Sequence, residues 1–98
     1  MGENIIYLEL LRRGYDVYVG KFDNYEIDFV AEKQGEKIYI QVAQKIETDE
    51  TQLREYSRLL NIKDNYSKYV ICADDFAGGN YEGIKTMNIA DFWLSEEF

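Results

Sequence analysis

The chemistry open to this chain is set by its residue types. Its 98 residues include no histidine and one cysteine, Cys72, which excludes Ser-His-Asp and Cys-His catalysis and histidine-ligated zinc. Neither GxxxxGK[ST] nor GxGxxG occurs, so nucleotide binding by either loop is unsupported. Carboxylate and amide oxygens remain, and these are the ligands that hard divalent cations prefer. We therefore look for a carboxylate site, with Glu3, Glu26 and Asp28 as candidates.

A hairpin is expected to position two of these acids. Hydrophobic and polar residues alternate over residues 25–32, with Tyr25, Ile27, Phe29 and Ala31 on one face and Glu26, Asp28, Val30 and Glu32 on the other. A second strand is predicted over residues 37–43. If Gln34-Gly35 is a two-residue turn, opposed residue numbers sum to about 69 and Asp28 lies opposite Gln41. The same register places Glu26 opposite Ala43.

The other elements complete an α/β (α+β) chain. A helix is predicted over residues 3–13, with an apolar stripe of Ile5, Leu8 and Leu11 together with Ile6 and Leu10, and it ends at Gly14. Further elements are a strand over 15–22, a helix from Thr48 or Asp49 to Leu60, a strand over 68–73, a weaker strand over 83–89 and a short helix over 90–94. Residues 74–80 are expected to form a flexible loop. This αβββαβ order predicts a mixed sheet with helices on both faces.

Composition favours one small domain over residues 1–98. Hydrophobic residues make up 46% of the chain and aromatic residues 15%, too many for a disordered chain. No apolar run is long enough to span a membrane and no signal peptide is evident, so we expect a cytoplasmic protein with no membrane association. The formal net charge of −8 argues against a broad nucleic-acid surface. A local basic face is still compatible with the first half of the chain.

Three short motifs resemble the core of the PD-(D/E)XK nuclease superfamily. They are Glu3 followed by Gly14-Tyr15-Asp16-Val17, then Glu26-Ile27-Asp28-Phe29-Val30-Ala31, and finally Gln41-Val42-Ala43 where the superfamily has Glu-x-Lys. The resemblance implies a restriction-endonuclease-like fold in which Glu3, Asp28 and Gln41 mark the catalytic positions. It also implies a metal site formed by Glu3, Glu26, Asp28 and Gln41.

The third motif departs from the nuclease pattern. Gln41 offers a neutral oxygen in place of a carboxylate, and Ala43 stands where the lysine that orients the attacking water belongs. We therefore expect weak Mg²⁺ or Mn²⁺ binding and a degenerate catalytic site. Arg54 is a candidate for the missing cation, and Lys45 is an alternative.

A further resemblance covers nearly the whole chain. Phrases such as Tyr7–Gly14, Glu26–Val30, Ile40–Ala43 and Ile62–Val70 are similar to the C-terminal domain of uncharacterised bacterial and archaeal AAA-type ATPases. This implies an ATPase module as a partner, in cis or in trans. The sequence given has no phosphate loop of its own, so it corresponds either to a separate domain or to part of a longer protein.

Three functions fit these observations. The first is a nuclease-fold domain that does not cleave and serves as a binding or regulatory module for an AAA-type ATPase. The second is a divalent-metal-dependent DNA nuclease with a relocated basic residue. The third is a structural association domain, for example a homo-oligomer formed through an exposed strand edge. The acidic balance and the triplet Gln41-Val42-Ala43 favour the first.

Overall fold

The structure, a computed structural model, describes residues 2–22, 25–43, 56–72, 79–81 and 83–95. Residues 56–60 are helical. The other elements are α1 (Gly2–Arg12), β1 (Asp16–Lys21), β2 (Glu26–Lys33), β3 (Glu36–Ala43), β4 (Ser67–Cys72), β5 (Gly79–Tyr81), β6 (Ile84–Asn88) and α3 (Ile89–Leu94). No helix within the described ranges is long and apolar enough to cross a membrane.

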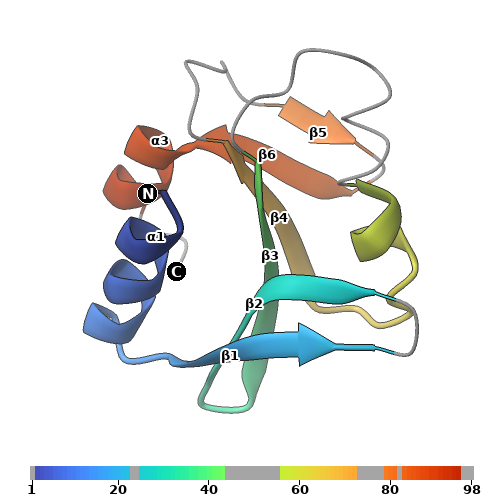
Figure 1. The fold of residues 1–98 in the computed structure, drawn as a ribbon, viewed down its shortest axis with the longest axis horizontal. Helices are drawn as coiled ribbons and strands as arrows, with labels where there is room; N and C mark the ends of the chain where they lie inside the picture. Colours follow the sequence, from blue (N-terminus) through green and yellow to red (C-terminus); the bar gives the residue numbers. More distant parts are fainter. Residues whose placement is uncertain (1, 23–24, 44–55, 73–78, 82, 96–98) are drawn as a thin grey trace.

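The strands form one six-stranded mixed sheet in the order β1-β2-β3-β4-β6-β5. The pairs β3–β4 and β4–β6 are parallel, and the other pairs are antiparallel. Helices α1 and α3 cover one face, and residues 56–60 lie on the other (Figure 1). The mixed sheet flanked by helices is confirmed. Strand β5 was not predicted: it includes Gly79 and Asn80 from the expected flexible loop, whose residues 74–78 lie outside the described ranges.

Two hydrophobic clusters hold the helices against the sheet. On one face Ile6, Leu10 and Phe92 pack with Ile40 and Ile71. On the other face the 56–60 helix contributes two buried side chains, and the cluster comprises Ile27, Val30, Tyr39, Ala43, Tyr56, Leu59, Ile62, Val70 and Ile84. The central strands β3 and β4 are therefore buried on both sides, as parallel pairing requires.

The predicted hairpin register is confirmed along most of β2 and β3. Pairs run from Lys33 opposite Glu36 to Phe29 opposite Ile40, and both turn residues have positive φ, 53° at Gln34 and 81° at Gly35. Positive φ at both positions identifies the two-residue hairpin turn as type I′. The ladder does not extend to the expected pair of Glu26 with Ala43, because regular pairing in this hairpin ends at Phe29.

A β-bulge changes which residues of β2 face each side of the sheet. Tyr18 pairs with Val30 and Gly20 with Ile27, so two residues of β2, Asp28 and Phe29, lie opposite Val19 alone. The extra residue shifts the alternation, and Ile27 consequently packs in the same cluster as Val30. The prediction that Ile27 shares a face with Phe29 and Ala31 was therefore wrong, since those two belong to the opposite cluster.

Close contact beside the bulge depends on a glycine. A Cβ atom placed on Gly20 would lie 2.7 Å from Cγ2 of Val30 and 3.2 Å from Cβ of Ile27. Both neighbours are branched at Cβ, so neither can move away easily. The absence of a side chain at Gly20 thus lets β1 approach β2 where β2 bulges.

Helix α1 is rotated relative to the prediction. Ile6 and Leu10 are fully buried, whereas Ile5, Leu8 and Leu11 of the predicted inward stripe are exposed. The reason is Glu9, a charged residue that is 1% exposed and is paired with Arg12 and Arg13 on its own helix. Because two arginines balance its negative charge, Glu9 can lie on the buried side of the helix between Ile6 and Leu10.

Candidate functional site

Asp28 and Gln41 form a reciprocal pair at the bulge. The backbone N–H of Asp28 donates to Oε1 of Gln41 at 2.7 Å, and the backbone N–H of Val42 donates to Oδ2 of Asp28 at 2.8 Å. Each side chain therefore satisfies a backbone group of the neighbouring strand where the regular ladder stops. The prediction that Asp28 and Gln41 are cross-strand neighbours is confirmed.

Gln41 is the buried member of the pair, and Asp28 is half-buried. Gln41 is 0% exposed, and its Nε2 atom has no hydrogen-bond partner in the described part of the chain. Because Oε1 accepts from Asp28, the orientation of the amide is fixed and Nε2 is a buried donor without an acceptor. Such a donor costs free energy unless a water or a ligand accepts from it.

Three further charged residues, Glu3, Glu26 and Arg58, shift the pKa of Asp28. Burial raises the pKa of Asp28 above its ordinary value, while the hydrogen bond from the Val42 N–H opposes this shift. The charges of Glu3 and Glu26 raise the pKa of Asp28 further, and the charge of Arg58 lowers it. Glu3 from α1 and Glu26 from the start of β2 thus act on the charge of Asp28, while their roles as metal ligands stay a prediction.

Arg58 was not among the predicted site residues. It is half-buried on the helical turn of residues 56–60. Arg54 and Lys45, the two candidates for the missing cation, lie outside the described residues. The sequence does contain a signal for Arg58, because it follows Arg54 by four residues and side chains at that spacing share one face of a helix. Ala43, at the position of the motif's lysine, is buried.

These residues do not fit a tightly bound divalent cation. Mg²⁺ and Mn²⁺ require several oxygen ligands, mainly carboxylates. Here Oε1 of Gln41 already accepts from Asp28, and the remaining polar atom of Gln41 is a donor, which cannot coordinate a metal. Within the described ranges, no three His, Cys, Asp or Glu side chains are grouped so as to hold a metal ion.

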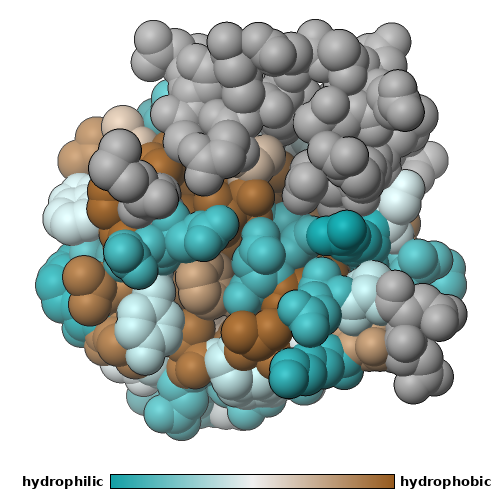
Figure 2. All heavy atoms as spheres, viewed as in Figure 1, coloured by the Kyte–Doolittle hydropathy of each residue, from teal (hydrophilic) through white to brown (hydrophobic). Residues whose placement is uncertain are grey.

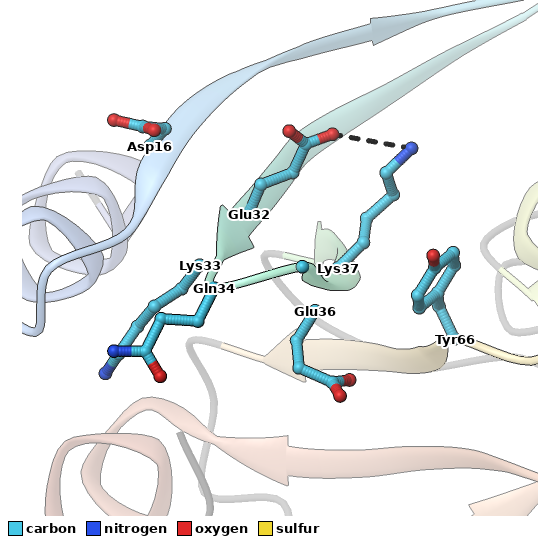
Figure 3. Close-up of a pocket in the computed structure, with 8 residues that line it drawn as sticks. Asp16, Glu32, Lys33, Gln34, Glu36, Lys37 and Tyr66 are labelled. Atoms are coloured by element: carbon cyan, nitrogen blue, oxygen red, sulfur yellow. Dashed lines mark ion pairs between the residues drawn. The ribbon is translucent and has the colours of Figure 1, made fainter.

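A separate cavity of about 380 Å³ lies at the hairpin turn, away from Asp28. Its lining includes Glu32, Lys37 and Tyr66, with Glu32 pointing toward Lys37 (Figure 3). The two charges are paired at 3.4 Å, and the Tyr18 hydroxyl donates to Glu32 at 2.5 Å. The hydrogen bond to Glu32 raises the pKa of Tyr18 to about 12. These contacts link β1, β2 and β3. The charged residues around the cavity therefore have a structural role.

Replacement of Asp28 by alanine is expected to destabilise the fold by about 1–3 kcal/mol, because the Val42 N–H loses its acceptor in a poorly solvated position. Asp28→Asn keeps an oxygen acceptor and should cost less. Urea unfolding at neutral pH measures both effects. Equal stability of the natural protein and Asp28→Ala would show that water satisfies the Val42 N–H.

The raised pKa of Asp28 gives that comparison a pH dependence. A carboxyl whose pKa is higher in the folded state than in the unfolded state binds its proton more readily when folded, so its contribution to stability increases as pH falls through that raised pKa. As pH falls, the natural protein should therefore gain stability relative to Asp28→Asn.

The fold and the site together define a small α/β domain with an acid–amide pair where the regular ladder between β2 and β3 ends. A family model described as "Domain of unknown function (DUF4143)" matches residues 1–92, and the chain belongs to that family. An uncharacterised protein of Haemophilus influenzae (strain ATCC 51907 / DSM 11121 / KW20 / Rd) is 46% identical over 92 residues, which are 94% of this chain. The chain spans only 22% of the length of that relative.

Proposed function

We propose that this chain is a nuclease-fold domain with a degenerate metal site, and that it acts as a non-cleaving binding or regulatory module with an AAA-type ATPase, in cis or in trans. The observation that carries the proposal is the Asp28–Gln41 pair. One oxygen of each side chain accepts from a backbone N–H group, and the buried Nε2 atom of Gln41 is a donor. Ala43 adds no functional group beside it.

Phosphodiester hydrolysis of the metal-assisted kind needs a positioned cation and an activated water. Gln41 stands where the superfamily has a negatively charged carboxylate, and Ala43 stands where it has a lysine. Each such loss is worth orders of magnitude in rate. Affinity for the DNA backbone comes mostly from phosphate neutralisation, which a net charge of −8 opposes.

We expect no cleavage when the natural protein is incubated with plasmid, single-stranded or branched DNA and Mn²⁺. The matched variants are Asp28→Ala in the site and Glu32→Ala at the hairpin cavity. Cleavage that disappears only in Asp28→Ala would overturn the proposal and establish the nuclease alternative. Cleavage that persists in both variants would identify a contaminating nuclease, and the natural protein would then count as inactive.

The nuclease scaffold itself is tested by restoring the motif. The double variant Gln41→Glu with Ala43→Lys returns the acid and the lysine to their positions in the superfamily pattern. Mn²⁺-dependent cleavage by this variant, absent from the natural protein, would show that the scaffold is a nuclease scaffold with a degenerate site. A folded double variant that neither binds Mn²⁺ nor cleaves would argue against a nuclease ancestry of the site.

The ATPase part of the proposal is supported by the length of the relative, which extends far beyond the 92 matched residues. We expect the full-length Haemophilus influenzae protein to hydrolyse ATP, and deletion of the segment that matches residues 1–92 to change the rate without abolishing nucleotide binding. If the full-length relative binds no ATP, the ATPase part of the proposal is wrong. A structural association domain would then be the better hypothesis.

A further inference from the structure

Helix α1 carries apolar residues on its outer side as well as on its buried side. Ile6 and Leu10 are fully buried, but Ile5, Leu8 and Leu11 are 40%, 62% and 41% exposed. These three residues recur every third position and form a stripe on the side of the helix away from the core. Large apolar side chains gathered on an exposed face often mark an interaction surface. The outer face of α1 is therefore a candidate interface.

Helix α3 extends this surface. Trp93 and Leu94 are 50% and 78% exposed, and Nη2 of Arg13, just after α1, donates to the carbonyl oxygen of Trp93 at 2.8 Å. Figure 1 shows α1 and α3 side by side, and Figure 2 shows hydrophobic residues exposed on that side of the molecule. We call Ile5, Leu8, Leu11, Trp93 and Leu94 the α1–α3 patch.

The size of the α1–α3 patch approaches what a stable interface requires. Five large, partly exposed apolar residues present on the order of several hundred Å², at the upper end of what monomers expose. A standard interface buries roughly 800 Å² per partner, and its rim is polar. The patch supplies the apolar centre of such an interface, and neighbouring polar residues of α1 supply its rim.

We propose that the α1–α3 patch is an interface between two copies of this chain, with the two α1 helices packed antiparallel about a two-fold axis at Leu8. In that arrangement Leu8 contacts Leu8 of the second copy, and Ile5 contacts Leu11 of the second copy. Because Ile5 and Leu11 are equally far from Leu8 along the helix, every apolar residue of the stripe meets another. Self-complementarity of this kind is the condition for a two-fold interface.

The polar residues of the same face obey the same symmetry. Asn4 and Arg12 flank the stripe at equal distances from Leu8, and both are exposed. The pairing therefore places the Asn4 carboxamide of one copy beside the Arg12 guanidinium of the other, an acceptor beside a donor. The one acid in the middle of α1, Glu9, is buried and paired with two arginines. In a chain with net charge −8, the residues of α1 that meet in this pairing include no acid, and the exposed acid Asp91 lies on α3, close to Trp93 in the sequence.

The test is the mass of the full chain in solution, by light scattering after gel filtration, from micromolar to high-micromolar concentration. We expect the natural chain to have twice the mass of one chain. Leu8→Lys places two cations across the axis and should raise the dissociation constant at least about a hundredfold, with unchanged circular dichroism. The matched control, Val19→Lys, changes another exposed apolar residue (48% exposed, against 62% for Leu8) on edge strand β1 and should leave the dimer intact.

A covalent probe fixes the position of the axis. Leu8→Cys should form a disulfide-linked dimer under mild oxidation, whereas Val19→Cys should not, and the natural Cys72 is buried. A natural chain that stays monomeric throughout the concentration range would overturn the proposal. A dimer that dissociates on Val19→Lys but survives Leu8→Lys would also overturn it, and would assign association to the β1 edge.

Discussion

Replacing Glu9 by alanine should be among the most destabilising single changes in this chain, with an expected loss of about 3–5 kcal/mol in the free energy of unfolding. Glu9 accepts from Arg12 and Arg13, with its Oε2 atom 2.5 Å from Nη2 of Arg12 and from Nε of Arg13. The side chain of Arg13 is 11% exposed, so the variant leaves a largely buried cation without its carboxylate. Arg13 also holds the carbonyl oxygen of Trp93, which couples the loss to the docking of α3.

Glu9→Gln separates charge from packing, because it keeps the shape and an accepting oxygen but removes the charge. We expect its cost to fall between those of Glu9→Ala and the natural protein. Urea unfolding followed by far-ultraviolet circular dichroism measures both. If Glu9→Ala costs less than about 1 kcal/mol, a typical exposed pair, water must replace the carboxylate at this position.

The pH range of this stabilisation follows from the pKa of Glu9. Hydrogen bonds from Arg12 lower that pKa to about 2, against the opposing effect of burial and with further help from Arg13. A carboxyl with a depressed folded-state pKa contributes its full stability above its unfolded value of about 4.5, and loses that contribution as pH falls toward 2. The difference between the natural protein and Glu9→Gln should therefore be constant from neutral pH to about pH 5 and should shrink below it.

Gln41→Glu is expected to have the largest effect in the candidate site. The position is 0% exposed, and the Asp28 carboxyl beside it already has a pKa raised by burial. A second carboxylate would be buried next to the first without a cation bonded to it. We expect a loss of about 3 kcal/mol at neutral pH, the scale of an uncompensated buried charge.

Two measurements distinguish this charge effect from a packing effect. The pKa of the introduced carboxyl should be raised in the folded state, so the stability lost at neutral pH should return as pH falls toward about 5. Gln41→Met, the matched control, removes the acceptor for the Asp28 N–H without adding charge, and its cost should not vary with pH. A pH-independent loss in Gln41→Glu would contradict the electrostatic explanation.

Divalent cations provide an independent readout of the same variant. A cation that binds only the folded state raises the free energy of unfolding, and it does so by more when it binds more tightly at a given concentration. Mn²⁺ should stabilise Gln41→Glu measurably more than it stabilises the natural protein, in which we expect weak binding at best. Equal stabilisation of both proteins would show that the cation binds elsewhere.

Much of the architecture was determined by the sequence alone. Hydrophobic periodicity located α1, the β2–β3 hairpin, β4, β6 and α3 to within a residue or two of their observed bounds. The turn residues Gln34 and Gly35 fixed the hairpin register, because a two-residue turn leaves a single pairing of the flanking strands. That local rule was enough to bring Asp28 and Gln41 together, although they are thirteen residues apart.

Only the tertiary structure decided how these elements face the core. The bulge at Asp28 and Phe29 arises from pairing with β1, and no alternation within β2 predicts it. The rotation of α1 depends on the burial of Glu9, which an amphipathic pattern assigns to solvent because the pattern counts residue types and cannot count ion pairs. The same rotation exposes Ile5, Leu8 and Leu11. Arg58 lowers the pKa of Asp28 only because its helix packs across the sheet. Local sequence patterns do not predict such a long-range contact.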